Sequence, residues 1–220
     1  MLTQEQITLL TEGARCLKVE LSDEALTNFS IYIEELLRWG RTTDLISQTE
    51  PETIIRKHIL DSLAVLTVLR PHGHLLDLGS GAGFPGLPLA IAEPSLAVTL
   101  LESRRKRANF LKEVIRKTNL ANIQAYEGRT EDFISRDGWR GTFAAVTTRA
   151  TWNIKEFLKT GSPFATKGGV LLALKGPQLE EELLEINRWL QENAFLLQTV
   201  HKYKLPFGKE KRAIAIFSLP

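Results

Sequence analysis

An acidic residue and a set of glycines stand together in residues 74–91, which read HLLDLGSGAGFPGLPLAI. Asp77 interrupts a short apolar run, and Gly81, Gly83 and Gly86 follow it with the spacing GxGxxG. Glycines allow a sharp backbone turn and let a ligand approach without a Cβ in the way. The free N–H groups at the start of the following helix favour a nucleotide-like or carboxylate-bearing ligand. The segment therefore predicts a strand, a glycine turn and a helix that hold such a ligand.

A second acid sharpens this prediction, because glycine spacing alone does not identify the ligand. Glu102 follows the next apolar run, about 20 residues on, where a carboxylate can hold ribose hydroxyls. The competing interpretation of Glu102 is an ion pair with Arg104 or Arg105. Asp77 also has two interpretations, since it can steer the cationic amino end of a cofactor or cap the turn. An acid before the turn is unusual for a nicotinamide site. The pattern D-x-G-S-G-x-G at residues 77–83, together with Glu102, instead resembles an S-adenosylmethionine site.

Polar residues also follow three later apolar runs. Thr130 and Glu131 come soon after residues 123–127, and in this kind of fold the loop there usually holds the adenine. Their competing interpretation is an ordinary helix start, with Thr130 as the N-cap. Arg149 stands where substrate and cofactor should meet, and its planar fork suits a carboxylate or phosphate. Lys175 has a similar but weaker claim, and a surface residue without a role is the alternative for Arg149.

A histidine and an aspartate lie on one face of a predicted helix, because His58 and Asp61 are three residues apart. They could be metal ligands, an acid–base pair, or a polar contact that packs this helix over the glycine turn. Among the other histidines, His72 and His74 flank a turn and His201 starts a basic run, so none completes a metal site. We therefore expect no metal, and we favour a packing or substrate-pocket role for the pair.

Charge is unevenly distributed in a chain whose formal net charge is only +2. Residues 1–60 hold 6 basic and 10 acidic residues, a balance of −4, whereas residues 100–117 hold 7 and 2, a balance of +5. Residues 201–212 hold 5 and 1, a balance of +4. Two basic segments in a nearly neutral chain indicate a surface that attracts phosphates. The candidate phosphate contacts are Arg104, Arg105, Lys106, Arg107, Lys209, Lys211 and Arg212. For Arg116 and Lys117 a solvated helix face is the favoured interpretation.

Composition favours one soluble domain with a possible small appendage, since the chain has 220 residues and 43% hydrophobic residues. Cys16 is the only cysteine, which excludes an intrachain disulfide and indicates a reducing compartment. The first residues lack the order of a signal peptide, and no apolar run is long enough to span a bilayer. We therefore expect a cytoplasmic protein. The scattered tryptophans fit the core better than a base-stacking role.

Helices are expected first, and alternating strands and helices after them. The predicted helices of the first third cover residues 3–17, 22–39 and 51–69. Thr3 and Gln6 predict a capping box for the first of them. The predicted strands cover residues 75–78, 98–101, 123–127, 143–147 and 169–174. The helices between them cover residues 86–92, 104–118, 154–161 and 178–193. Such alternation predicts a parallel sheet covered by helices on both faces.

The end of the chain departs from this alternation. Residues 195–205 and 212–219 are two strand-like runs joined by Pro-Phe-Gly-Lys-Glu, which predicts a hairpin. One of the two strands must then run antiparallel to the main sheet. A parallel sheet that ends in such a hairpin resembles the class I methyltransferases.

Five segments together resemble the RsmG family, also called glucose-inhibited division protein B, of bacterial 16S ribosomal RNA guanine-N7 methyltransferases. These segments are RKHILDSL at 56–63, DLGSGAGFPGLPLAI at 77–91, LLESRRKRANFL at 100–111, TRA at 148–150 and LKG at 174–176. The resemblance spans nearly the whole chain. One departure is DLIS at residues 44–47, where the family often has Asn-Leu-Thr.

The resemblance implies an α/β class I S-adenosylmethionine methyltransferase fold, with a helical extension at residues 1–70 and a methyltransferase domain at 71–220. The expected cofactor contacts, from the residues and the resemblance together, are Asp77, Gly79, Gly81, Gly83, Phe84, Glu102, Thr130, Glu131 and Arg149. The expected substrate or RNA contacts are His58, Asp61, Arg104, Arg105, Arg107, Lys175, Lys211 and Arg212. The implied substrate is one guanine of 16S ribosomal RNA or of the small-subunit particle, and a monomer is expected.

Guanine N7 carries a lone pair and no proton, so the implied reaction needs no general base. Alignment and well-placed dipoles are what remains for the protein. Two alternatives stay open, a nicotinamide-dependent oxidoreductase that uses the GxGxxG turn and a non-catalytic RNA-binding protein with a methyltransferase fold.

Overall fold

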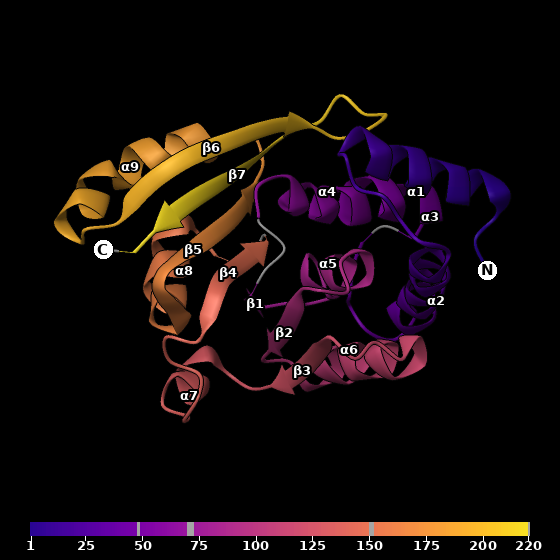
Figure 1. Cartoon of the computed structure of the whole chain (residues 1–220), viewed down its shortest axis with the longest axis horizontal. Helices are drawn as coiled ribbons and strands as arrows, with labels where there is room; N and C mark the ends of the chain where they lie inside the picture. The colour runs from indigo at the N-terminus through magenta and orange to yellow at the C-terminus, as the bar shows by residue number, and fades with distance from the viewer. Residues whose placement is uncertain (48, 70–72, 150–151, 220) are drawn as a thin grey trace.

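A seven-stranded sheet forms the centre of the computed structural model, which describes residues 1–47, 49–69, 73–149 and 152–219 (Figure 1). The strands are β1 (His74–Leu78), β2 (Ala97–Glu102), β3 (Ile123–Glu127), β4 (Phe143–Arg149), β5 (Ala165–Lys175), β6 (Leu196–Lys204) and β7 (Lys211–Ser218). Their order across the sheet is β3-β2-β1-β4-β5-β7-β6. All pairings among β1–β5 are parallel, and β7 is antiparallel to both β5 and β6. The predicted parallel sheet with a terminal hairpin is confirmed.

The order of the strands reverses between β1 and β4, since the chain moves outward from β1 in one direction and from β4 in the other. In open α/β sheets the crevice beyond the carboxyl ends of the strands at such a point is where ligands bind. The candidate residues at the ends of β1, β2 and β4 therefore share one edge of the sheet.

Helices cover both faces of the sheet (Figure 1). The helices of the sheet region are α5 (Gly86–Ala92), α6 (Arg105–Thr118), α7 (Thr130–Ile134), α8 (Ile154–Gly161) with a 3-10 turn (Ser162–Phe164), and α9 (Leu179–Glu192). Helices α5 and α6 lie on the side of the N-terminal helices, and α7, α8 and α9 on the other side. Arg104 and Gln178, predicted inside helices, are instead the N-caps of α6 and α9, because their backbones have not yet turned helical.

Two helices begin the chain with side-chain caps. Helix α1 (Gln4–Cys16) has the predicted capping box, in which the Thr3 hydroxyl accepts from the Gln6 N–H and the Gln6 side chain accepts from the Thr3 N–H. The Ser22 hydroxyl caps α2 (Asp23–Gly40) by accepting from the N–H of Ala25. Each cap satisfies a backbone donor that the first helical turn leaves without a partner.

The predicted uninterrupted helix at residues 51–69 is wrong in detail. The segment consists of α3 (Pro51–Ile54), a π-helical turn (Ile55–Ile59), α4 (Leu60–Leu63) and a 3-10 turn (Ala64–Thr67). Two backbone carbonyl oxygens of this segment accept hydrogen bonds from side chains. Ser62 Oγ donates to His58 O at 2.7 Å, and Arg149 Nη2 donates to Lys57 O at 2.7 Å. Competing donors of this kind disturb the regular helical ladder. Such π turns occur frequently at functional sites.

The N-terminal helices and the sheet share one hydrophobic core. Fully buried side chains from this region, such as Leu10 and Phe29, pack in the same cluster as Leu75 of β1 and Leu100 of β2. A second cluster lies on the opposite face of the sheet, around Phe157. The predicted boundary between residues 70 and 71 lies outside the described residues, and the division there stays a prediction. Within the described residues, no helix is long and apolar enough to cross a membrane.

Candidate functional site

The turn after β1 has the backbone that its glycines predict. Gly79, Gly81 and Gly83 have φ angles of 67°, 56° and 99°, in the left-handed region that residues with a Cβ rarely adopt. The N–H groups of Gly79 and Ser80 donate to the carbonyl of Leu101 at 2.9 and 3.2 Å, which ties the turn to the end of β2. The turn is therefore a rigid extension of the sheet edge.

Asp77 is a buried acid that faces the start of α5. Its Oδ2 accepts from the Gly86 N–H at 3.0 Å, whereas its Oδ1 is buried with no hydrogen-bond partner among the described residues. Burial raises the pKa of this carboxyl to about 7. A Cβ on Gly86 would lie 2.9 Å from Oδ2, so only glycine leaves room for the contact. The capping interpretation of Asp77 is seen directly, and a role toward the amino end of a cofactor stays a prediction.

Glu102 is fixed by two backbone donors. Its Oε2 accepts from the Gly81 N–H at 2.8 Å and its Oε1 from the Arg104 N–H at 2.7 Å, and the residue is only 4% exposed. No ion pair joins it to Arg104 or Arg105 in the described part of the chain. Because a carboxylate offers about four lone-pair sites, these two contacts leave acceptor capacity for a ligand.

An open cavity of about 270 Å³ lies beside Glu102, at the carboxyl ends of β1, β2 and β3. Its lining residues are Gly79, Leu101, Glu102, Ser103, Arg104, Arg107, Gly128, Thr130 and Trp152. The volume is near the lower end of the roughly 300–1,000 Å³ typical of small-molecule sites. Glu131 is exposed on the same short helix as Thr130, whose N-cap is Arg129. A cavity lined by Gly79 of the glycine turn, by the acid Glu102 and by Thr130 fits S-adenosylmethionine.

Trp152 was expected in the core, and in the structure it also lines this cavity. It is partly buried against the second hydrophobic cluster, so its ring belongs to both places. The sequence carried a signal for it, because Trp152 stands three residues after Arg149, in the loop that follows a strand end. Lys175 Nζ donates to the carbonyl of Trp152 at 2.9 Å and pairs with Glu182 at 3.0 Å, so the lysine links Trp152 to α9.

An aromatic stack joins the N-terminal helices to the glycine turn. The ring of Phe84 lies 4.9 Å from that of His58 and 5.6 Å from that of Tyr32, measured between centroids. The Tyr32 hydroxyl donates to the carbonyl of Ala82 at 2.6 Å. Burial, followed by the charges of Arg149 and other nearby cations, lowers the pKa of His58 to about 3. Sequence reasoning missed Tyr32, because a tyrosine on an apolar helix face gives no sign of a distant carbonyl.

Arg149 lies at the end of β4, between the aromatic stack and Asp61. Its guanidinium carbon is 5.4 Å from the centre of the Phe84 ring, and its Nε is 3.1 Å from Asp61 Oδ2. His58 and Asp61 were predicted on one helix face, and both approach the same arginine. In the described part of the chain no cluster of His, Cys, Asp and Glu could hold a metal ion.

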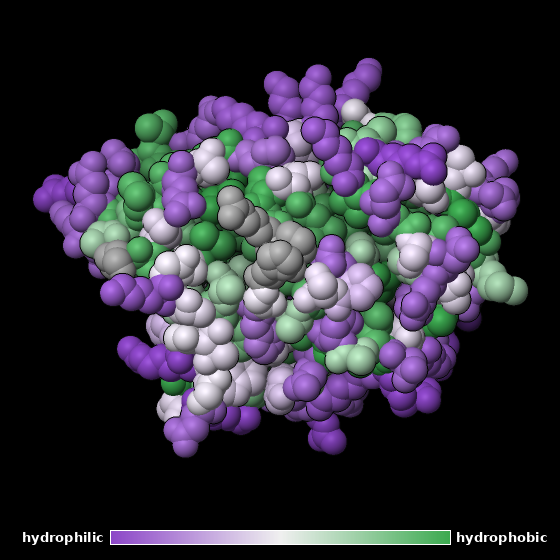
Figure 2. All heavy atoms as spheres, in the orientation of Figure 1, coloured by the Kyte–Doolittle hydropathy of each residue, from purple (hydrophilic) through white to green (hydrophobic). Residues whose placement is uncertain are grey.

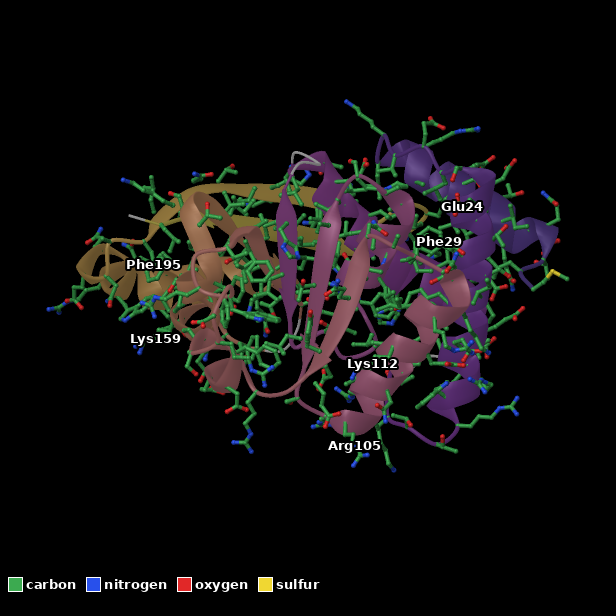
Figure 3. All side chains as sticks on the ribbon, turned by 60° about the horizontal axis from the view of Figure 1, so that its bottom comes forward. Glu24, Phe29, Arg105, Lys112, Lys159 and Phe195 are labelled. Carbon is green, nitrogen blue, oxygen red and sulfur yellow. The ribbon has the colours of Figure 1, made fainter. Side chains whose placement is uncertain are left out.

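The first basic segment places its arginines at the start of α6. Arg104 and Arg105 are exposed, and Figure 3 shows Arg105 at the end of the helix, projecting from the surface. Arg107 instead folds over the glycine turn and donates to the carbonyl of Asp44 at 2.7 and 3.0 Å. Arg116 and Lys117 form ion pairs with Glu113 and Glu35, which is consistent with the favoured solvated face.

The second basic segment lines a larger cavity of about 600 Å³ beside the terminal hairpin. We call this cavity the hairpin groove, and its lining residues are Gly176, Pro177, Leu179, Glu180, Lys202, Tyr203, Lys204, Lys211, Arg212 and Ala213. Hydrophilic side chains also project at the upper edge of the molecule, over the β6–β7 loop (Figure 2). The two basic segments therefore lie at different ends of the same sheet edge.

Two solved structures with a similar fold are an S-adenosylmethionine-dependent methyltransferase and a protein in complex with AdoMet. An Aquifex aeolicus "SAM dependent methyltransferase" matches with a TM-score of 0.56 at 17% identity, over 76% of this chain and 93% of that one. The crystal structure of M. jannaschii TYW2 in complex with AdoMet matches with a TM-score of 0.53 at 16% identity, over 70% and 72% of the two chains. The class I S-adenosylmethionine methyltransferase fold is thus confirmed.

Sequence relatives cover almost the whole chain. "Ribosomal RNA small subunit methyltransferase G" of Desulfitobacterium hafniense is 38% identical over 216 residues, 98% of this chain and 90% of that protein. The protein of the same name from Syntrophus aciditrophicus is 39% identical over 211 residues, 95% and 88% of the two chains. The GidB family model, described as rRNA small subunit methyltransferase G, matches residues 25–214. The chain therefore belongs to the GidB family of S-adenosylmethionine-dependent methyltransferases.

Proposed function

We propose that this chain transfers the methyl group of S-adenosylmethionine to N7 of one guanine in 16S ribosomal RNA. The observation that carries the proposal is the cavity at the ends of β1, β2 and β3, where Glu102 is fixed between the glycine turn and α6. The family supports a ribosomal RNA substrate over the nicotinamide alternative. We also propose a cytoplasmic monomer that acts on 16S ribosomal RNA or on the small-subunit particle.

The cofactor contacts are proposed from the residues that surround the cavity. Glu102 would hold the ribose hydroxyls, and Thr130 and Glu131 the adenine. Arg149, with Phe84 beneath its guanidinium, would hold the carboxylate. Asp77 and the three glycines of the turn would shape the cradle. When bound, S-adenosylmethionine supplies a methyl group on a positively charged sulfur.

The residues of this site need not remove a proton, because guanine N7 has a lone pair and no hydrogen. His58 is consistent with such a mechanism, since a pKa of about 3 makes its imidazole a weak base, and its ring is stacked on Phe84. The protein would instead align the two reactants, and alignment alone accounts for a large share of many enzymatic rates. Arg104 and Arg105 on one side, and Lys211 and Arg212 on the other, would hold the RNA phosphates.

A methyl-transfer assay tests the proposal directly. The purified chain would be incubated with methyl-labelled S-adenosylmethionine and with small-subunit particles or 16S ribosomal RNA from cells that lack this protein. We expect label at one guanine, mapped as N7-methylguanine by strand cleavage. Label on another atom, or none on either substrate, would contradict the proposal.

A titration with both cofactors separates the remaining alternatives. Calorimetry should show binding of S-adenosylmethionine and none of NAD. NAD binding without a response to S-adenosylmethionine would support the oxidoreductase. RNA binding without either cofactor would support the non-catalytic protein.

A further inference from the structure

A buried acid that the proposed reaction does not use lies at the junction of three distant segments. Asp61, in α4, is 3% exposed. Its side chain faces Arg149 at the end of β4 and Tyr203 and Arg212 of the terminal hairpin. These partners are far from Asp61 in sequence, so only the folded chain brings them together.

Each oxygen of the Asp61 carboxylate has a defined neighbour. Oδ2 lies 3.1 Å from Arg149 Nε, and Oδ1 accepts from the Tyr203 hydroxyl at 2.8 Å. Arg212 Nε lies 3.6 Å from the same Oδ1. The exposed fraction of the side chain rises from 4% for Asp61 to 15% for Arg149 and 26% for Arg212, so the anion is the buried centre and the arginines extend toward the surface.

This arrangement argues against contact between Asp61 and RNA. A carboxylate repels phosphate, and the oxygens of this one are engaged by a hydroxyl and a guanidinium beneath the surface. The two arginines, by contrast, point to different parts of the candidate site. Arg149 contacts the Phe84 ring of the glycine turn, and Arg212 lines the hairpin groove.

We propose that Asp61 is a positioning residue, a buried anion that holds the guanidinium of Arg149 at the cofactor side and that of Arg212 at the RNA side. The inference rests on the proposed function, in which those arginines contact the cofactor carboxylate and an RNA phosphate. An arginine has several rotatable bonds and five N–H donors, so a fixed anion can select one orientation while the guanidinium also contacts a ligand. Tyr203 completes the anion's hydrogen bonding from the hairpin.

The test is a double-mutant cycle between Asp61→Asn and Arg149→Met. Affinity for S-adenosylhomocysteine is measured by calorimetry, and affinity for a 16S RNA fragment by fluorescence anisotropy. We expect Asp61→Asn alone to weaken cofactor-analogue binding roughly tenfold and to weaken RNA binding as well. In the Arg149→Met background, Asp61→Asn should cause no further loss of cofactor-analogue affinity, because the residue through which it acts is gone.

If Asp61→Asn lowers cofactor-analogue affinity equally with and without Arg149, the inference is overturned. A merely structural role of Asp61 would give this result, because it would not depend on the arginine. Asp137→Asn, at an exposed position, is the matched control and should change neither affinity. If Asp61→Asn does not fold, Asp61→Glu keeps the charge, moves it by one methylene and enters the same cycle. A loss of cofactor-analogue affinity from Asp61→Glu that has the same size with and without Arg149 would likewise overturn the inference.

Failure of the inference and failure of the proposed function give different results. If Arg149→Met binds the cofactor analogue normally and still methylates RNA, the positioning role of Asp61 is wrong and the proposed function stands. If the unaltered chain binds no S-adenosylmethionine, the proposed function fails before the cycle begins.

Discussion

Near the glycine turn, Asp77 and Glu102 accept hydrogen bonds from backbone N–H groups 9 and 21 residues away in sequence. On the hairpin side of the same sheet edge, Asp61 is held by side chains, and its partner Tyr203 is 142 residues away. A backbone donor is present whatever the side chain at that position, whereas a side-chain donor depends on one residue in one place. The two regions thus hold their buried acids by different routes, backbone N–H groups in one and side chains in the other, and substitutions should affect them differently.

The cavities of the two regions also differ in the residues that line them. The one beside the glycine turn is lined largely by residues that follow β1, β2 and β3, at the strand ends. The hairpin groove is lined by residues of two antiparallel strands and the start of α9, with Lys202, Lys204, Lys211 and Arg212 among them. The first has the size and position of a small-molecule site, and the second is a basic surface suited to an extended anion.

The largest expected effect concerns the buried carboxyl of the glycine turn. Its folded pKa of about 7 exceeds the ordinary value of 3.8, so between these values the folded state binds more protons than the unfolded state. Stability should therefore fall as pH rises through this window, by on the order of 4 kcal/mol when the window is complete. Asp77→Asn should remove this dependence, and urea unfolding from about pH 4 to pH 8 measures it.

The charged neighbours of Asp77 are Glu102 and Arg149, and neither is changed in this variant. Free energies of unfolding that stay parallel for the two proteins across the pH range would show that Asp77 is not protonated in the folded state. Such a result would also weaken the contrast between Asp77, which accepts from a backbone N–H, and Asp61, which is held by two arginines.

The next effect tests how tightly the turn is packed. A Cβ on Gly86 would lie 2.3 Å from Leu100 Cδ2 and 2.9 Å from Asp77 Oδ2. Gly86→Ala should therefore lower the free energy of unfolding by about 2 kcal/mol, because atoms around it must shift. Gly40→Ala is the matched control, since a Cβ there has nothing within 4 Å. Thermal unfolding compares the two, and equal midpoints would show that the turn can adjust.

A smaller effect is expected on cofactor affinity. Glu102→Ala should weaken binding of S-adenosylhomocysteine roughly tenfold, because charged hydrogen bonds to the ribose are lost. Glu127→Ala is the matched control, since Glu127 is exposed and pairs with Glu102 in register on the adjacent strand. Calorimetry measures both variants, with circular dichroism to verify folding. Unchanged affinity in Glu102→Ala would remove the ribose assignment.

The smallest effect concerns the exposed arginines. Reversing the charge of Arg104 and Arg105 to glutamate should weaken RNA binding several-fold and flatten its dependence on salt by about 0.7 per lost phosphate contact. Arg116→Glu is the control, because Arg116 is already paired with Glu113 at 2.8 Å. Anisotropy titrations between 50 and 200 mM salt, roughly the range over which such contacts are resolved, provide the slopes. Identical slopes for all three proteins would exclude these arginines from the RNA surface.

Local patterns predicted the parts of the site that depend on neighbouring residues. The glycine turn, the strand before it and the capping box at Thr3 were predictable, because left-handed backbone and caps need specific residues at short spacing. The parallel sheet and the hairpin followed from the alternation of strands and helices. The position of Glu102 at a strand end was predictable for the same reason, although its two backbone donors were not.

By itself the sequence determined the order of the elements, the glycine backbone and the family, since these rest on residue types at fixed spacing. Only the tertiary structure decided that Asp61 lies beneath two arginines, that Trp152 lines the cavity and that a π turn interrupts the third helical segment. The physical reason is that these features depend on side chains from distant segments meeting in a shared core. The spacing of residues along the chain does not indicate which of those side chains will be in contact.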